Sequence, residues 1–259
     1  MAGAKRGYLV PEPAALARLE CQEVSFAYGR KLVLDGFSFT LSQGITGLLG
    51  PNGAGKSTLL NVLATIRQPR TGTVRYDGVL GAGKDLGTVR KQLGYLPQRF
   101  DLMAGSSCLD NVTYAAWCNG VAAAQCTAAA DAALELVNLG AKRKARVRTL
   151  SGGQRQRLGI ACAIAHSPAF ILLDEPTVGL DPAQRIDVRQ HLVEIAKTAC
   201  VLVSTHLVED LAAMGADAVV IHQGHKVFQG SLADMTGVAD PDVRTLEASY
   251  LALVGGSSE

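Results

Sequence analysis

Long apolar runs are missing from this 259-residue chain, although 48% of its residues are hydrophobic. No stretch approaches the roughly 18 apolar residues that a membrane-spanning helix needs. Pro11 and Pro13 interrupt any signal-peptide core that would follow Lys5 and Arg6. We therefore expect a soluble protein, which another protein must hold if it works at a membrane.

An excess of charge of one sign is also missing, because 25 basic residues face 23 acidic ones. Domains that bind nucleic acid are usually strongly basic, so we expect no nucleic-acid partner. The densest basic run, residues 142–148, follows a helical pattern. We interpret this run as a solvated helix end rather than a nucleic-acid patch.

Paired cysteines are absent as well. The six cysteines form no C-x-x-C pair and do not cluster with histidine, which favours reduced thiols over disulfides or a zinc site. His222 and His225 lack both the spacing and the glutamate of a metalloprotease helix. We expect ordinary positions at strand ends for these two histidines.

What the sequence does contain is a series of strand and helix patterns. Residues 19–28 and 32–41 alternate apolar and polar side chains, as half-buried antiparallel strands do. Three later segments are densely aliphatic, which is typical of buried parallel strands: 170–174, 200–205 and 217–222. Amphipathic helices are predicted at 181–197, 207–214 and 242–254. Alanine-rich segments between 107 and 139 predict a helical insertion.

The segment GPNGAGKST matches the phosphate-loop pattern G-x-x-x-x-G-K-[ST]. An apolar strand precedes it, and a helix over 56–67 is predicted to follow, with Leu59, Leu60, Leu63 and Ile66 on one face. Glycines let backbone N–H groups point at a phosphate, and the helix N-terminus adds partial positive charge. This context favours nucleotide binding over a simple tight turn. The expected binding residues are Gly50, Pro51, Asn52, Gly53, Ala54, Gly55, Lys56, Ser57 and Thr58.

Two carboxylates, Asp174 and Glu175, follow the predicted buried strand at 170–174. Open α/β sheets bind ligands at this end of their strands. One carboxylate is suited to hold Mg²⁺ through water, and the other to orient an attacking water. The alternative is a pair of surface acids that end a strand. Lys56 can reach the β- and γ-phosphates, and Ser57 can ligate the metal.

The segment LSGGQ at 150–154 precedes a helix and lies upstream of LDEP. It resembles the signature motif of ATP-binding cassette (ABC) ATPases. Further motifs follow in the family's order: Tyr28 resembles the adenine-stacking aromatic, Gln98 the Q-loop glutamine, Asp181 the D-loop aspartate and His206 the switch histidine. The resemblance covers residues 18–253.

The resemblance implies an α/β fold: a P-loop NTPase core with a parallel sheet, an antiparallel β subdomain on the N-terminal side and an inserted helical subdomain. Residues 1–17 would then be an N-terminal extension and residues 18–259 a single nucleotide-binding domain, with the helical subdomain at about 99–165. The implied cofactors are ATP and Mg²⁺.

The resemblance also implies a role for each motif. Lys56 and Ser57 would hold phosphates and metal, with Asp174 and Gln98 completing the Mg²⁺ shell. Glu175 would be the general base, and His206 would contact the γ-phosphate. In this family two subunits pair head to tail, so the signature residues would face the partner's ATP while Asp181 lies at the interface. Those signature residues are Ser151, Gly152, Gly153 and Gln154. Ser151 is also expected to cap a helix.

The chain is most similar to the ATPase subunit of a bacterial transporter of the drug- and peptide-exporter branch. We expect it to lie peripherally on the cytoplasmic face of the cell membrane, with an integral membrane permease and a second ATPase subunit as partners. Export is favoured over import, because only about 50 residues follow His206. The alternative is a soluble ABC ATPase of translation or nucleic-acid maintenance. A small-molecule kinase is a third possibility, but it does not account for LSGGQ.

Docking to the permease is expected through residues 99–117, where Phe100, Leu102 and Met103 form an apolar patch. The alternative is that these side chains cover the core of the helical insertion itself.

Overall fold

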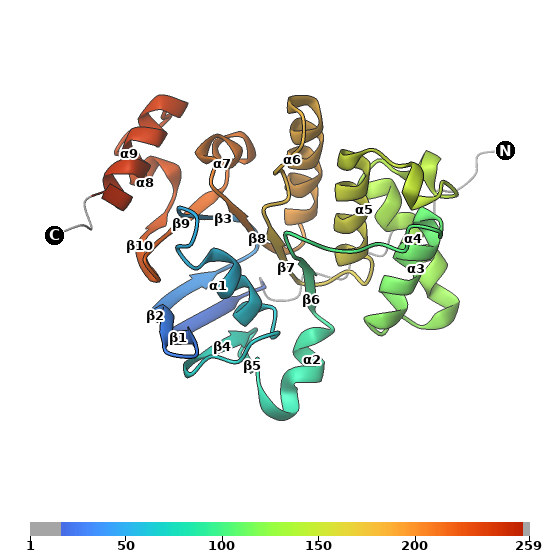
Figure 1. The fold of residues 1–259 in the computed structure, drawn as a ribbon, viewed down its shortest axis with the longest axis horizontal. Coiled ribbons are helices and arrows are strands. Elements are labelled where there is room, and N and C mark those ends of the chain that lie inside the picture. The colour runs from blue at the N-terminus through green and yellow to red at the C-terminus, as the bar shows by residue number, and fades with distance from the viewer. Residues whose placement is uncertain (1–16, 256–259) are drawn as a thin grey trace.

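The computed structural model describes residues 17–255. An antiparallel sheet and a mixed sheet lie side by side, and helices cover the mixed sheet (Figure 1). The predicted extension at 1–17 falls outside the described residues apart from Ala17. The phosphate loop, Gln98, the acidic pair and His206 each come at the end of a different strand, so the order of the strands determines which of them meet.

The antiparallel sheet has the order β2-β1-β4-β5. The predicted strands are confirmed as β1 (Leu19–Tyr28) and β2 (Lys31–Leu41). Two further strands, β4 (Thr71–Tyr76) and β5 (Val79–Leu80), complete the sheet. They were not anticipated, because their short sequences lack a clear alternation of apolar residues.

The mixed sheet has the order β10-β9-β3-β8-β7-β6. Its pairings from β9 to β6 are parallel, which confirms the interpretation of the three aliphatic segments, and only the edge strand β10 is antiparallel. Parallel strands end at one edge of a sheet, so the residues that follow them gather there. The strands are β3 (Gly44–Leu49), β6 (Leu93–Leu96), β7 (Phe170–Asp174), β8 (Cys200–Thr205), β9 (Asp217–His222) and β10 (His225–Gly230).

Helices connect these strands, and a group of three stands to one side of the mixed sheet (Figure 1). That group is α3 (Cys108–Cys118), α4 (Ala123–Leu136) and α5 (Gly152–Ile164), joined by the 3₁₀ turns Gly140–Lys142 and Val147–Thr149. The division of the chain into subdomains stays a prediction. The remaining helices are α1 (Lys56–Leu63), α2 (Leu86–Arg90), α6 (Pro182–Ala196), α7 (Val208–Met214), α8 (Leu232–Thr236) and α9 (Val243–Gly255), with a 3₁₀ turn at Gly83–Asp85.

Helix α1 ends earlier than predicted. The sequence placed Ile66 on its buried face, but the helix stops at Leu63 and Ile66 is 55% exposed. Thr65 adopts a left-handed backbone with φ of 60°, which interrupts the helical hydrogen-bond pattern. The N–H groups of Ile66 and Arg67 both donate to the carbonyl of Asn61 instead. The prediction for Ile66 was therefore wrong.

The alternation of side chains along each buried strand produces two hydrophobic cores. On β8, Val201 and Val203 enter a core shared with the helices, whereas Leu202 enters a core shared with α1 and the antiparallel sheet. β7 behaves in the same way, with Leu173 on one side and Leu172 on the other. Both faces of the mixed sheet are thus covered, and only its strand ends are open to a ligand.

Expectations about cysteine, histidine and membrane spans can be checked over residues 17–255. Every cysteine there is free, and no group of three or more metal-ligating side chains is present in that range. His222 ends β9 and His225 begins β10, as predicted. None of the helices described in this range is long and apolar enough to cross a membrane.

Candidate functional site

The phosphate loop joins β3 to α1 and leaves the start of that helix without a side-chain cap. Gly55, at the N-cap, has a φ of 112°, which residues with a Cβ rarely adopt. At Gly50 a Cβ would come within 2.4 Å of the carbonyl oxygen of Ile221, so only glycine fits beside β9. The loop therefore presents the uncapped N–H groups of α1 to an anion.

Lys56 is held inside this loop. Its Nζ donates to the carbonyl oxygens of Gly50 at 2.7 Å and Pro51 at 3.3 Å, and the residue is only 6% exposed. Burial lowers the pKa of Lys56, while the carboxylates of Glu175 and Asp174 act in the opposite direction. The ammonium group thus donates to backbone carbonyls and has one ion-pair partner, the carboxylate of Glu175, at 3.9 Å.

Asp174 ends β7 in a fully enclosed position, 3% exposed. The hydroxyl of Ser204 on β8 donates to one of its carboxylate oxygens at 2.5 Å. The same hydroxyl accepts the backbone N–H of Glu175 at 2.9 Å. Ser204 therefore orients both acidic residues.

Glu175 lies at the centre of the site. Its Oε1 lies 3.9 Å from Nζ of Lys56 and 3.7 Å from Nδ1 of His206, and its Oε2 accepts a hydrogen bond from Nε2 of Gln98 at 3.1 Å. Its backbone φ is 51°, an uncommon value for a residue with a side chain. Lys56, Gln98 and His206, which the sequence placed in one site with Glu175, thus all lie within 3.9 Å of its carboxylate.

These neighbours come from the ends of parallel strands. Gln98 follows β6, Glu175 follows β7 and His206 follows β8, and these three strands are adjacent in the sheet. The alternative for Asp174 and Glu175, that they are simple surface acids, is inconsistent with the burial of Asp174 and the contacts of Glu175.

Tyr28 stands at the end of β1, 47% exposed. Its ring contacts Phe26 edge-on at 5.0 Å between centroids, and the guanidinium of Arg67 lies 5.9 Å from its centroid. A half-exposed ring of this kind is available for stacking with a base.

Ser151 is the N-cap of α5. Its hydroxyl accepts the N–H of Gln154 at 3.3 Å, while the Gln154 side chain accepts the N–H of Ser151 at 3.2 Å. This capping box confirms the predicted cap. A Cβ on Gly152 would meet open space, whereas one on Gly153 would come within 2.3 Å of the Gln184 side chain.

The signature segment does not join the site of its own chain. α5 is well separated from α1 in the ribbon view (Figure 1). The side-chain hydrogen bonds of Ser151 and Gln154 go to each other and to Lys142. Asp181 caps α6 by accepting the N–H of Gln184 at 2.9 Å. Tertiary structure thus separates the cluster around Glu175 from the segment at the start of α5, while Tyr28 ends β1 and Asp181 caps α6.

Ser204 is the functional residue that sequence reasoning missed. One signal was present, because a hydroxyl inside the apolar segment CVLVST has to find a hydrogen-bond partner once the strand is buried.

Comparison with known proteins places these observations in a family. Residues 34–178 match the family model described as ABC transporter. The Nod factor export ATP-binding protein I of Paraburkholderia xenovorans is 36% identical over 83% of this chain and 71% of its own length. The chain belongs to the ABC transporter family. Its ATP-binding subunits hydrolyse ATP in a complex with membrane components, and this chain is such an ABC ATPase.

Two further comparisons agree with the family assignment of this ABC ATPase. The methionine import ATP-binding protein MetN 2 of Burkholderia mallei is 37% identical over 72% of this chain and 48% of its own length. The solved structure of the ATP-binding subunit of an ABC transporter superposes with a TM-score of 0.78, at 26% identity over 90% of this chain and 98% of the other. The predicted fold class is therefore confirmed.

Proposed function

We propose that this ABC ATPase binds ATP and Mg²⁺ at the cluster around Glu175, and that a second subunit completes the site with the segment at the start of α5. The observation that carries the proposal is the position of Glu175. Its carboxylate is 3.9 Å from the phosphate-loop Lys56 and 3.7 Å from His206. A water held by this carboxylate would lie beside any phosphate bound to the loop.

The side chains available for Mg²⁺ are hard oxygen donors, which is the kind of ligand that this ion prefers. Ser57 is exposed at the start of α1. Asp174 uses one oxygen for Ser204, which leaves its second oxygen available. Gln98 donates its amide N–H to Glu175, so its amide oxygen stays available for metal. Bound Mg²⁺ would neutralise charge on the phosphates.

In the proposed reaction, Lys56 binds the phosphates and Glu175 orients a water for in-line attack. Gln98 donates a hydrogen bond to one oxygen of the Glu175 carboxylate, and His206 lies 3.7 Å from the other. His206 is 44% exposed on its side chain, which leaves its ring accessible to the γ-phosphate. Tyr28 would stack on adenine.

We place the signature segment against the ATP of the partner subunit. Gly152 is open on its outer side, and α5 begins with N–H groups that favour an anion. Over the described residues, Ser151 hydrogen-bonds with Gln154 and not with the cluster around Glu175, so we assign the anion to the other subunit. Two copies arranged head to tail would then form two equivalent sites.

Glu175→Gln tests the proposal. The amide keeps the shape of the side chain but is a poor base, so hydrolysis should fall about a hundredfold or more. ATP should still bind, and the trapped pair should elute as a dimer in size-exclusion chromatography with ATP and Mg²⁺ but not with ADP. Near-normal turnover would exclude Glu175 as the base, and an ATP-independent elution volume would exclude ATP-driven pairing.

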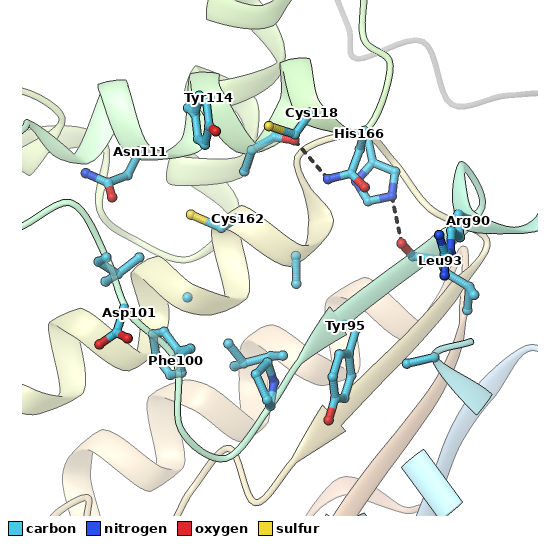
Figure 2. A pocket seen from close by; sticks show the side chains of 18 of the residues that line it. Arg90, Leu93, Tyr95, Phe100, Asp101, Asn111, Tyr114, Cys118, Cys162 and His166 are labelled. Atoms are coloured by element: carbon cyan, nitrogen blue, oxygen red, sulfur yellow. Dashed lines mark hydrogen bonds between the residues drawn. The ribbon is translucent and has the colours of Figure 1, made fainter. Parts of the chain in front are cut away.

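A groove next to the catalytic cluster is the proposed docking site for the membrane partner. It has a volume of about 500 Å³ and is bordered by β6, α3, α5 and the segment after Gln98. Figure 2 shows Phe100 and Tyr95 on one side of this groove and Tyr114 and Cys118 on the other. A partner seated here would press on the segment that begins at Gln98.

The apolar patch predicted for docking is partly packed against the core and partly exposed in the groove. Phe100 and Leu102 pack against the core, and a Cβ on Gly159 would come within 2.6 Å of the Phe100 ring. Met103 is 41% exposed, and all three side chains line the groove. The core-covering alternative thus holds for part of the patch, and Met103 carries the docking proposal.

We further propose that the transporter is an exporter. The chain matches 71% of the length of a relative named for Nod factor export but only 48% of one named for methionine import. Inside-out vesicles that contain this subunit and its permease should accumulate exported compounds when ATP is added outside. ATP-dependent loss of compound from the vesicles would overturn this direction.

A further inference from the structure

A buried charge cluster lies behind the catalytic site, between α6 and α7. The carboxylate of Asp210 is 1% exposed. One of its oxygens accepts a hydrogen bond from the hydroxyl of Thr177 at 2.6 Å, and the other lies 3.5 Å from Nε of Arg189. Thr177 is itself 2% exposed. We call Thr177 and Asp210, together with Arg189, whose side chain is 18% exposed, the buried cluster.

A second pair of contacts runs parallel to the first. Arg185, one helical turn before Arg189, lies 3.8 Å from Glu209 on α7 and donates its Nε–H to the carbonyl oxygen of Leu180 at 3.3 Å. Both arginines of α6 therefore face acids of α7, and both sets of contacts also reach the loop between Glu175 and Asp181.

The buried cluster joins the two segments that carry Glu175 and His206 to helix α6. Thr177 is two residues after Glu175, Asp210 is four residues after His206, and Arg189 belongs to the helix that Asp181 caps. Besides the bond from Thr177, the N–H of Asp210 donates to the carbonyl of Leu207, next to His206. The cluster thus connects the chain on both sides of the 3.7 Å contact between Glu175 and His206.

Stability does not explain this arrangement. Burying a carboxylate is unfavourable even beside a partly exposed guanidinium, and well-packed apolar side chains often stabilise a fold as well or better. Glu175, by contrast, needs external support, because a non-glycine residue with φ of 51° persists only where neighbouring contacts hold it. Ser204 holds its N–H, and the chain after it is held at Thr177.

We infer that Thr177, Asp210 and Arg189 are positioning residues, which set the place of the Glu175 carboxylate relative to His206 and so determine the rate of ATP hydrolysis. None of the three touches the site itself. The inference rests on the roles proposed above for Glu175 and His206. Since a displacement of a catalytic group by about 1 Å can lower a rate roughly a hundredfold, loss of the Thr177 contact should act on kcat.

Thr177→Val and Thr177→Ser form the matched pair that tests the inference in the full-length chain with Mg²⁺ and ATP. Valine keeps the shape and removes the donor, whereas serine keeps the donor. We expect Thr177→Val to lower kcat by about tenfold or more, with KM for ATP changed less than threefold. Thr177→Ser should hydrolyse ATP close to the wild-type rate. Asp210→Asn provides a second variant, because the amide oxygen can still accept from Thr177 while the charge that faces Arg189 is lost.

Thermal unfolding of each variant separates positioning from stability. A kcat defect measured well below the unfolding temperature, with serine rescue, supports the inference. Wild-type kcat in Thr177→Val, or equal loss in the valine and serine variants, overturns it. Glu175→Gln in the same assay separates failure of this inference from failure of the proposed site. If Glu175→Gln keeps its turnover, the proposed site is wrong. If Glu175→Gln is inactive and Thr177→Val is active, only the positioning role of the buried cluster is excluded.

Discussion

Nε2 of Gln98 donates a hydrogen bond to Oε2 of Glu175 at 3.1 Å, although the two residues are 77 positions apart. Gln98 also begins the segment whose next residues line the groove, including Phe100 and Met103. One side chain therefore connects the proposed docking groove to the proposed catalytic carboxylate. We therefore expect a partner bound in the groove to act on Glu175 through Gln98.

Substitutions of Gln98 should lower the rate of ATP hydrolysis, because the Gln98 side chain donates a hydrogen bond to the Glu175 carboxylate. Gln98→Ala removes a hydrogen bond to a charged group and should lower phosphate release by about tenfold. Gln98→Glu places a second carboxylate beside Glu175 and should lower it further, because like charges repel. Phosphate release measured with and without the membrane partner checks both. Wild-type rates in Gln98→Ala would show that this contact has no catalytic role.

The ring of Tyr28 should matter for ATP affinity, while its hydroxyl should not. Tyr28→Phe keeps the stacking face, so affinity should stay within a few fold. Tyr28→Ala should weaken binding by about 1–2 kcal/mol, as for other base–aromatic contacts. Titration with a fluorescent ATP analogue measures the difference. If alanine binds as tightly as tyrosine, adenine stacks elsewhere.

A charge in the groove should prevent docking without disturbing the ATP site. Met103→Glu introduces a carboxylate at an exposed apolar position and should abolish co-purification with the membrane partner, while ATP binding is kept. Leu251→Glu is the matched control, because Leu251 is 62% exposed on α9, which lies at the other side of the molecule from α3 (Figure 1). Equal co-purification of both variants would place the docking surface elsewhere.

Mixing two inactive variants tests whether the signature segment serves the partner. Lys56→Ala damages a subunit's own phosphate loop, and Ser151→Arg damages the surface offered to the other subunit. Each homodimer should be inactive because both of its sites contain one damaged half. In a mixed dimer, one site contains both damaged halves and the other contains two intact halves. Hydrolysis or ATP occlusion should therefore return at the intact site. Mixed dimers that show neither would assign the signature segment to its own chain.

The strand and helix pattern was largely predictable because it depends on local preference. Alternation along residues 19–28 and the aliphatic segments around β7 and β8 report burial directly. Helix α1 shows the limit of this reasoning. The apolar spacing continued to Ile66, but the left-handed backbone at Thr65 ended the helix, and periodicity carries no information about that angle.

By itself the sequence determined which residues are the candidates for the chemistry, because the phosphate loop, the acidic pair and the signature segment are each contiguous and each depends on neighbours a few positions away. Only the tertiary structure decided which of them meet. The order of β6, β7 and β8 brings Gln98, Glu175 and His206 together, and leaves Ser151 on a separate helix. Contacts such as Ser204 with Asp174, or Thr177 with Asp210, join residues about 30 positions apart. They exist because strands and helices must pack their apolar faces, and that packing places the remaining polar side chains beside partners that no local pattern specifies.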